Sequence, residues 1–144
     1  MTILIDSNII IGFLKGESSI VEYIKQVVKA NNPIFISSIS VYEVYLGIIA
    51  NLYLKQGRPH LVDQFLEDYN QLLQACTIIE MTKEAAEKGA TIYAQAQGKG
   101  ITIKQNDCLI AGSALSVGIS RIITRDKQDF EKIKKIAGLE FFSF

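Results

Sequence analysis

Short, mainly apolar segments alternate with helical patterns along the whole chain. The apolar segments predict five strands, at Thr2–Ile5, Ile34–Ser37, Cys76–Glu80, Ile122–Thr124 and Glu140–Phe142. The segments between them predict helices at Ile9–Leu14, Ser18–Ala30, Ser38–Leu54, 60–75, 83–97, 107–117 and Lys127–Ile136. We expect the helix Ser38–Leu54 to be largely buried, and Thr82 and Asn106 to cap the helices 83–97 and 107–117. Strands that alternate with helices predict a parallel sheet covered on both faces, and short, mainly apolar strands agree with such burial. We therefore expect an α/β fold, with all 144 residues in one domain.

Four carboxylates stand out against this apolar background. Asp6 is the only charged residue within 1–14, and Glu43 is the only one between Ile34 and Leu54. Asp107 precedes the uncharged run 108–120, and Asp126 follows a predicted strand. An unpaired carboxylate is costly to bury, so these acids need partners. A single cation shared by several of them is the simplest partner.

The predicted strands bring these acids to one side of the sheet. Asp6 ends the first strand, and Asp126 lies just beyond the fourth; Glu43 comes early in the helix after the second strand, and Asp107 begins another helix. Ligands of open parallel sheets bind beyond the carboxyl ends of the strands. Carboxylate oxygens select hard cations, so we expect Mg²⁺ or Mn²⁺, with metal-assisted hydrolysis of a phosphate ester as the matching chemistry. Taken singly, Asp6, Asp107 and Asp126 could instead be helix caps.

Four short motifs around these acids resemble those of PIN-domain ribonucleases, and among them the VapC-type toxins. They are Ile-Leu-Ile-Asp6-Ser-Asn8, Ser-Val-Tyr-Glu43-Val-Tyr-Leu-Gly47, Asn-Asp107-Cys-Leu-Ile-Ala-Gly and Ile-Ile-Thr124-Arg-Asp126-Lys-Gln-Asp129-Phe130. They occur in the family's order and at its usual spacing over essentially the whole chain. One departure is that a proline common before the third acid is absent, with Thr102 and Ile103 there instead.

The resemblance implies a three-layer α/β/α sandwich with a five-stranded parallel sheet. It also implies Mg²⁺- or Mn²⁺-dependent endonuclease activity on RNA, such as tRNA or rRNA. Asp6, Glu43, Asp107 and Asp126 would hold the metal and position the attacking water. Asn8 and Thr124 would orient these groups, with Asp129 as a further supporting acid. A VapC-like protein would pair with a VapB-type antitoxin and form a homodimer, and Tyr42, Tyr45, Leu46, Tyr53 and Leu54 could serve either interface, or simply the core.

The formal net charge is zero, so any contact with RNA must come from a local basic patch. Between Lys99 and Lys135 there are eight basic and four acidic residues. Lys104, Arg125 and Lys127 are nearest in sequence to the acids, and we expect them to contact phosphates. The alternative is that they are ordinary solvated charges on helix surfaces.

Two other functions remain open at the level of sequence. One is a phosphatase of the haloacid-dehalogenase type with Asp6 as nucleophile, although Asn8 stands where that family has a second aspartate. The other is a non-catalytic PIN-like RNA-binding module. Cys76 and Cys108 lack metal-site spacing and predict reduced thiols in a cytoplasmic protein. The start of the chain does not predict a signal peptide, and the polar residues within 34–54 argue against a membrane span.

Overall fold

The computed structural model describes residues 2–144, which form a five-stranded sheet flanked by helices. The strands are β1 (Ile3–Ile5), β2 (Ile34–Ser37), β3 (Thr77–Ile79), β4 (Arg121–Thr124) and β5 (Glu140–Ser143). All neighbouring strands are parallel, in the order β3-β2-β1-β4-β5. The predicted parallel sheet is confirmed. Its central strand, β1, is bonded on one side to β2 and on the other to β4, although β4 lies far away in sequence.

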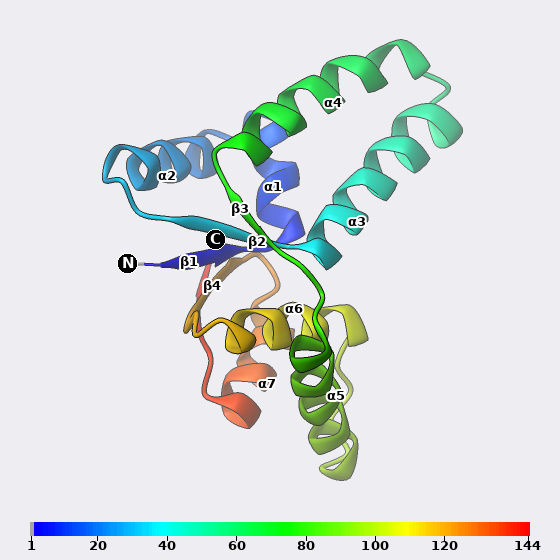
Figure 1. The fold of residues 1–144 in the computed structure, drawn as a ribbon. Helices are drawn as coiled ribbons and strands as arrows, with labels where there is room; N and C mark the ends of the chain where they lie inside the picture. The colour runs from blue at the N-terminus through cyan, green and yellow to red at the C-terminus, as the bar shows by residue number, and fades with distance from the viewer. Residues whose placement is uncertain (1) are drawn as a thin grey trace.

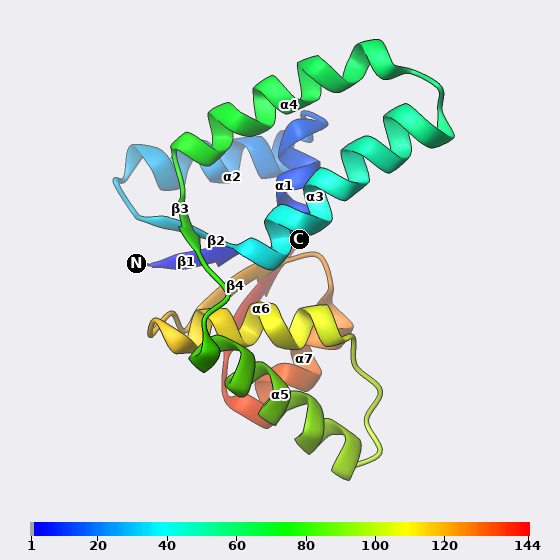
Figure 2. The same cartoon turned by 45° about the vertical axis from the view of Figure 1, so that its right-hand side comes forward.

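Helices cover both faces of the sheet and make the predicted three-layer sandwich (Figures 1 and 2). One layer contains α1 (Ser7–Leu14), α2 (Ser18–Lys29), α3 (Ser38–Ile48), its π-helical continuation η1 (Ile49–Lys55) and α4 (Pro59–Gln74). The other contains α5 (Lys83–Gly98), α6 (Gln105–Ser116) and α7 (Lys127–Ala137). Successive residues of a strand point to opposite faces. Accordingly Ile3 and Ile5 pack into the first layer, and Leu4 packs into the second.

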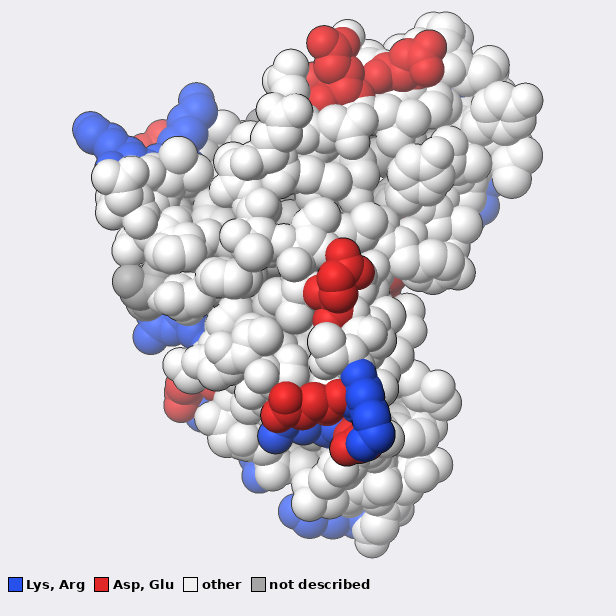
Figure 3. Space-filling model, in the orientation of Figure 1, with Lys and Arg blue, Asp and Glu red and all other residues white. Residues whose placement is uncertain are grey.

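Segment 38–54 differs from the prediction of a largely buried helix. The regular α-helix stops at Ile48, and several large apolar side chains are exposed, including Tyr42 at 61% and Leu54 at 71%. Figures 1 and 2 show the reason, because α3 and α4 form an antiparallel pair that extends beyond the sheet and leaves one side of α3 uncovered. In Figure 3 the surface over α3 is largely uncharged, whereas acidic side chains lie over α4. No described helix is both long enough and apolar enough to span a membrane.

Two predicted helix starts have different outcomes. Thr82 caps α5 as expected, because its hydroxyl accepts a hydrogen bond from the Ala85 N–H at 3.1 Å. The prediction that Asn106 caps the next helix is wrong: α6 begins at Gln105, one residue earlier, and Lys104 occupies the N-cap without a side-chain cap. Asn106 is thereby free to point its amide at another helix, where it donates to Glu43.

Both cysteines are free thiols, as the sequence predicted. Burial raises the pKa of each to about 11, so both are protonated at neutral pH. Neither thiol is activated as a nucleophile, since activation requires a lowered pKa.

Candidate active site

Asp6 is fixed at the carboxyl end of the central strand by hydrogen bonds to its backbone and to its carboxylate. Its backbone N–H continues the β1–β4 pairing by donating to the Ile123 carbonyl at 2.9 Å. Its carboxylate accepts from the Ser7 N–H at 2.8 Å, which caps α1, and from the Thr124 hydroxyl at 2.8 Å. The side chain is buried, so its position is set before any ligand arrives.

Asn8 and Thr124 connect the end of β1 to the turn after β4. The Thr124 hydroxyl, which donates to Asp6, also accepts the Asp126 N–H at 2.9 Å and the Asn8 amide at 3.3 Å. The side-chain amide oxygen of Asn8, Oδ1, accepts the Arg125 N–H at 3.0 Å. One threonine hydroxyl therefore sets the relative positions of two predicted acids, Asp6 and Asp126.

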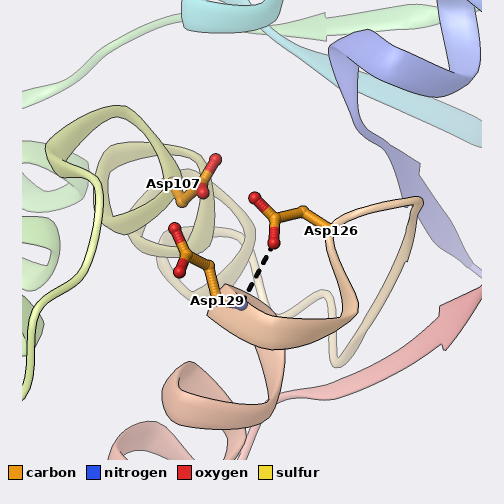
Figure 4. A group of neighbouring side chains, drawn as sticks. All are labelled: Asp107, Asp126 and Asp129. Atoms are coloured by element: carbon orange, nitrogen blue, oxygen red, sulfur yellow. Dashed lines mark hydrogen bonds between the residues drawn. The ribbon is translucent and has the colours of Figure 1, made fainter.

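Three acids, Asp126 among them, meet beside this turn, and Figure 4 shows their carboxylates facing one another. Asp107 from the first turn of α6, with Asp126 and Asp129 from the start of α7, each provide an oxygen within 4.8 Å of the other two. Asp126 also caps α7, because its Oδ1 accepts the Asp129 N–H at 3.1 Å. The sequence analysis predicts only a supporting role for Asp129. Its spacing of three residues from Asp126 indicates a position beside the other acids, because it puts both side chains on the first turn of one helix.

Glu43 lies outside this tight group but within electrostatic reach of the site. Its Oε2 accepts the Asn106 amide at 3.4 Å, so α3 and α6 are joined beside Asp107. Its charge contributes to raising the pKa of Asp6. Asp6 is likewise outside the tight group, yet its charge raises the pKa of Asp107. All four predicted acids thus share one end of the molecule, in a looser arrangement than a single coordination shell.

Two buried carboxylate oxygens at this site lack hydrogen-bond partners. They are Oδ2 of Asp107 and Oε1 of Glu43. Unpartnered buried acceptors are rare in folded proteins and call for a ligand or an ion. The donors are all oxygens, and the described residues offer no neighbouring histidine or cysteine group of the zinc type. The site therefore fits a hard divalent cation such as Mg²⁺ or Mn²⁺.

The pKa values of the acids show how strongly they crowd one another. Burial raises the pKa of Asp107 to about 8, and the charge of Asp6 and a hydrogen bond with Asp129 add to the effect. Burial raises the pKa of Asp6 to about 6, despite the bonds from Thr124 and Ser7. At Asp126 partial burial is outweighed by the Asp129 N–H and by Lys104, so its pKa is lowered. A bound cation would stabilise the charged forms of the raised acids.

A model of the PIN domain family matches residues 3–136 of the sequence. The chain belongs to the PIN domain family. No curated protein matches it. Its fold is similar to a chain in the VapBC2 complex of Rickettsia felis bound to a promoter DNA fragment, with a TM-score of 0.80 and 23% identity over 100% of this chain and 99% of that one.

Two further solved structures have the same fold. For DNA-bound VapBC from Salmonella typhimurium the TM-score is 0.79 and the identity 23%, covering 99% of this chain and 98% of that one. For Mycobacterium tuberculosis VapC20, described as a sarcin-ricin loop cleaving toxin, the TM-score is 0.56 and the identity 11%, covering 83% and 86%. The predicted PIN-type fold is confirmed.

The three basic residues expected to contact RNA have different surroundings in this PIN domain. The Lys104 ammonium lies 3.0 Å from Oδ2 of Asp126 and so faces the acids directly. Arg125 forms an ion pair with Glu17 of the α1–α2 turn, outside the acidic group. The Lys127 ammonium is 4.0 Å from Glu131 on the surface of α7. Their role toward RNA stays a prediction.

Proposed function

We propose that this PIN domain, residues 1–144, is a metal-dependent endoribonuclease that hydrolyses phosphodiester bonds. The observation that carries the proposal is the pair of buried, unpartnered carboxylate oxygens on Asp107 and Glu43 among other acids at the carboxyl edge of a parallel sheet. Buried acids with raised pKa values next to unsatisfied acceptors are typical of a metal-assisted hydrolase.

The residues form two groups: acids that would hold the cation, and polar residues that position these acids. Asp6, Glu43, Asp107 and Asp126 would hold Mg²⁺ or Mn²⁺, with Asp129 adjacent to Asp107 and Asp126. When bound, such a cation lowers the pKa of water and stabilises charge on the phosphate. Thr124 and Asn8 keep the acids in register through the bonds described above.

The substrate class and partners follow from the family and the fold. RNA, with tRNA or rRNA as first candidates, would lie across the acidic edge with Lys104, Arg125 and Lys127 at its phosphates. The solved structures with this fold include two VapBC complexes and a sarcin-ricin loop cleaving toxin, which supports a cytoplasmic toxin of a toxin–antitoxin pair. A VapB-type antitoxin and a second copy of the chain are the proposed protein partners. The exposed apolar side of α3 offers a surface for either of them.

The phosphatase alternative fits these contacts less well. A haloacid-dehalogenase-type mechanism needs an acid two residues after the nucleophile, and here the Asn8 side chain is held between Asp6, Thr124 and the Arg125 N–H. A carboxamide in that network cannot protonate a leaving group. Turnover of para-nitrophenyl phosphate by the native protein, abolished in Asp6→Asn, would favour the phosphatase.

The test is RNA cleavage by the native protein, Asp6→Asn and the control Asp63→Asn, using total tRNA and rRNA with Mg²⁺ or Mn²⁺. Asp63 is an exposed acid on α4, remote from the site in sequence and fold. We expect metal-dependent cuts that Asp6→Asn slows by more than about 100-fold, since even outer partners of metal ligands cost about 10- to 100-fold. Absence of cleavage by a folded, metal-binding, antitoxin-free protein would favour a non-catalytic RNA-binding module.

A further inference from the structure

Lys104 is attached to the acidic site at both its backbone and its side chain. Lys104 is the N-cap residue of α6, three residues before Asp107. Its backbone N–H donates to Oδ2 of Asp129 at 3.4 Å. Its ammonium donates to Oδ2 of Asp126 at 3.0 Å. The lysine side chain is nevertheless 71% exposed, whereas that of Asp126 is only 20% exposed. An exposed cation on the rim therefore neutralises a partly buried carboxylate.

The neighbouring basic residues differ from Lys104 in how they are held. The Lys132 ammonium lies 3.5 Å from Asp129, but it also donates to the Thr102 carbonyl at 2.8 Å and so ties the α5–α6 connection to α7. Arg125 is paired with Glu17, away from the acids. Within residues 2–144, Asp126 is the one acceptor found for the Lys104 ammonium.

The two oxygens of Asp126 are not equivalent. Oδ1 is occupied by the Asp129 N–H, a bond that α7 needs for its cap. Oδ2 is therefore the oxygen that Asp126 can offer to a cation shared with Asp107, and in Figure 4 the Asp126 oxygen without a dashed line points toward Asp107. Lys104 occupies this same oxygen. An ammonium and a divalent cation bound to one oxygen would repel each other strongly at such short range.

We propose that Lys104 is a built-in counter-cation of the acidic site, which a divalent cation displaces from Asp126 and which then contacts a phosphate of the RNA. This inference rests on the metal-dependent nuclease function proposed above. The lysine stem is long and exposed, so the ammonium can leave Asp126 without any change of the backbone. Once released it stays at the rim of the site, where a compact ammonium is suited to a phosphate oxygen.

The exchange couples metal binding to RNA binding. A phosphate that holds the ammonium removes it as a competitor at Asp126, so RNA tightens the metal. By linkage the metal tightens RNA by the same factor. Without the Lys104 ammonium the metal binds more tightly on its own, and this part of the coupling disappears.

The first experiment is calorimetric titration of Mn²⁺ into the RNA-free native protein, Lys104→Met and Lys134→Met. Lys134→Met is the matched control, because it removes the same charge from a lysine paired with Glu140 at the far end of α7. We expect Lys104→Met to lower the Kd for Mn²⁺ about three- to tenfold, from loss of an exposed ion pair and of charge repulsion. Lys134→Met should stay within about twofold of native, since exposed charges are largely screened.

The second experiment measures binding of a fluorescein-labelled single-stranded RNA in Ca²⁺, with gels to verify that the RNA stays intact. Lys104→Met should weaken binding and reduce the slope of log affinity against log salt by about one. If the native protein binds Mn²⁺ and Lys104→Met binds it equally or more weakly, the exchange is refuted and the nuclease proposal stands. If the native protein binds no Mn²⁺, both proposals fail, and an unchanged salt slope refutes the phosphate contact.

Discussion

The strongest prediction about stability concerns Asp107, whose pKa of about 8 lies well above the ordinary 3.8 of an aspartate. Between these two values the folded protein binds more protons than the unfolded chain. The contribution of Asp107 to the free energy of unfolding therefore falls as pH rises from about 4 to about 8, and this contribution is most favourable below that range. Replacing Asp107 with asparagine removes the charge at nearly constant shape. The variant should not lose this free energy of unfolding as pH rises, and it should be more stable than the native protein at pH 8 in the absence of metal.

The size of the effect follows from the pKa values. One pKa unit corresponds to about 1.4 kcal/mol, so confining a charge at Asp107 costs on the order of 3 to 5 kcal/mol at pH 8. The burial of Asp107, at 6% exposed, keeps water from screening much of it. For a chain of this size we expect Tm to rise by at least about 5 °C at pH 8.

Thermal melting followed by circular dichroism, in buffers with a chelator, measures this difference directly. At pH 4.5 the native Asp107 is protonated, and the two melting curves should come close together. Asp63→Asn serves as the control for loss of one negative charge from an exposed site, and it should shift Tm little at either pH. The reasoning is refuted if Asp107→Asn melts at or below the native temperature at pH 8.

Three further predictions follow from the same geometry. Mg²⁺ or Mn²⁺ at millimolar concentration should raise the Tm of the native protein but not of Asp107→Asn, and an unchanged native Tm would count against a shared cation site. Gly112→Ala should destabilise by about 1 to 3 kcal/mol, because its Cβ would lie 2.4 Å from a backbone carbonyl oxygen of α5; Gly47→Ala, with open space around its Cβ, should be neutral or stabilising in urea titrations. Thr124→Val should weaken Mn²⁺ binding about 10- to 100-fold by removing the donor to Asp6, whereas Thr124→Ser should retain native affinity in calorimetry.

The sequence was sufficient for the strands and for the edge at which the acids gather. Strand Ile34–Ser37 was predicted with its observed bounds, because an apolar segment between a turn and a hydroxyl-rich helix start is a clear strand signal. The same reasoning put Asp6 and Asp126 just beyond strand ends, where they lie. Parallel packing then leaves the carboxyl edge as the shared location.

The sequence was insufficient to predict which side chains contact one another across the site. The grouping of Asp129 with Asp107 depends on the packing of α7 against α6, which no local pattern encodes. The sequence left open whether Tyr42 belongs to an interface or to the core, because an apolar helix gives no sign of which faces its neighbours leave open. The assignment of Asn106 as a cap failed for a related reason, since its amide is satisfied by Glu43 on another helix rather than by its own.

The central position of β1 between β2 and β4 has a consequence for the order in which the protein becomes active. Asp6 and the Thr124 hydroxyl that holds it are 118 residues apart in sequence. Chains fold from the amino terminus during synthesis, so β1 can pair with β2 long before β4 exists. The bond that fixes Asp6 forms only after nearly the whole chain has emerged. A nascent chain that stalls before Arg121 would therefore carry the first acid without its positioning hydroxyl, so newly made protein acquires a complete site only at the end of its own translation.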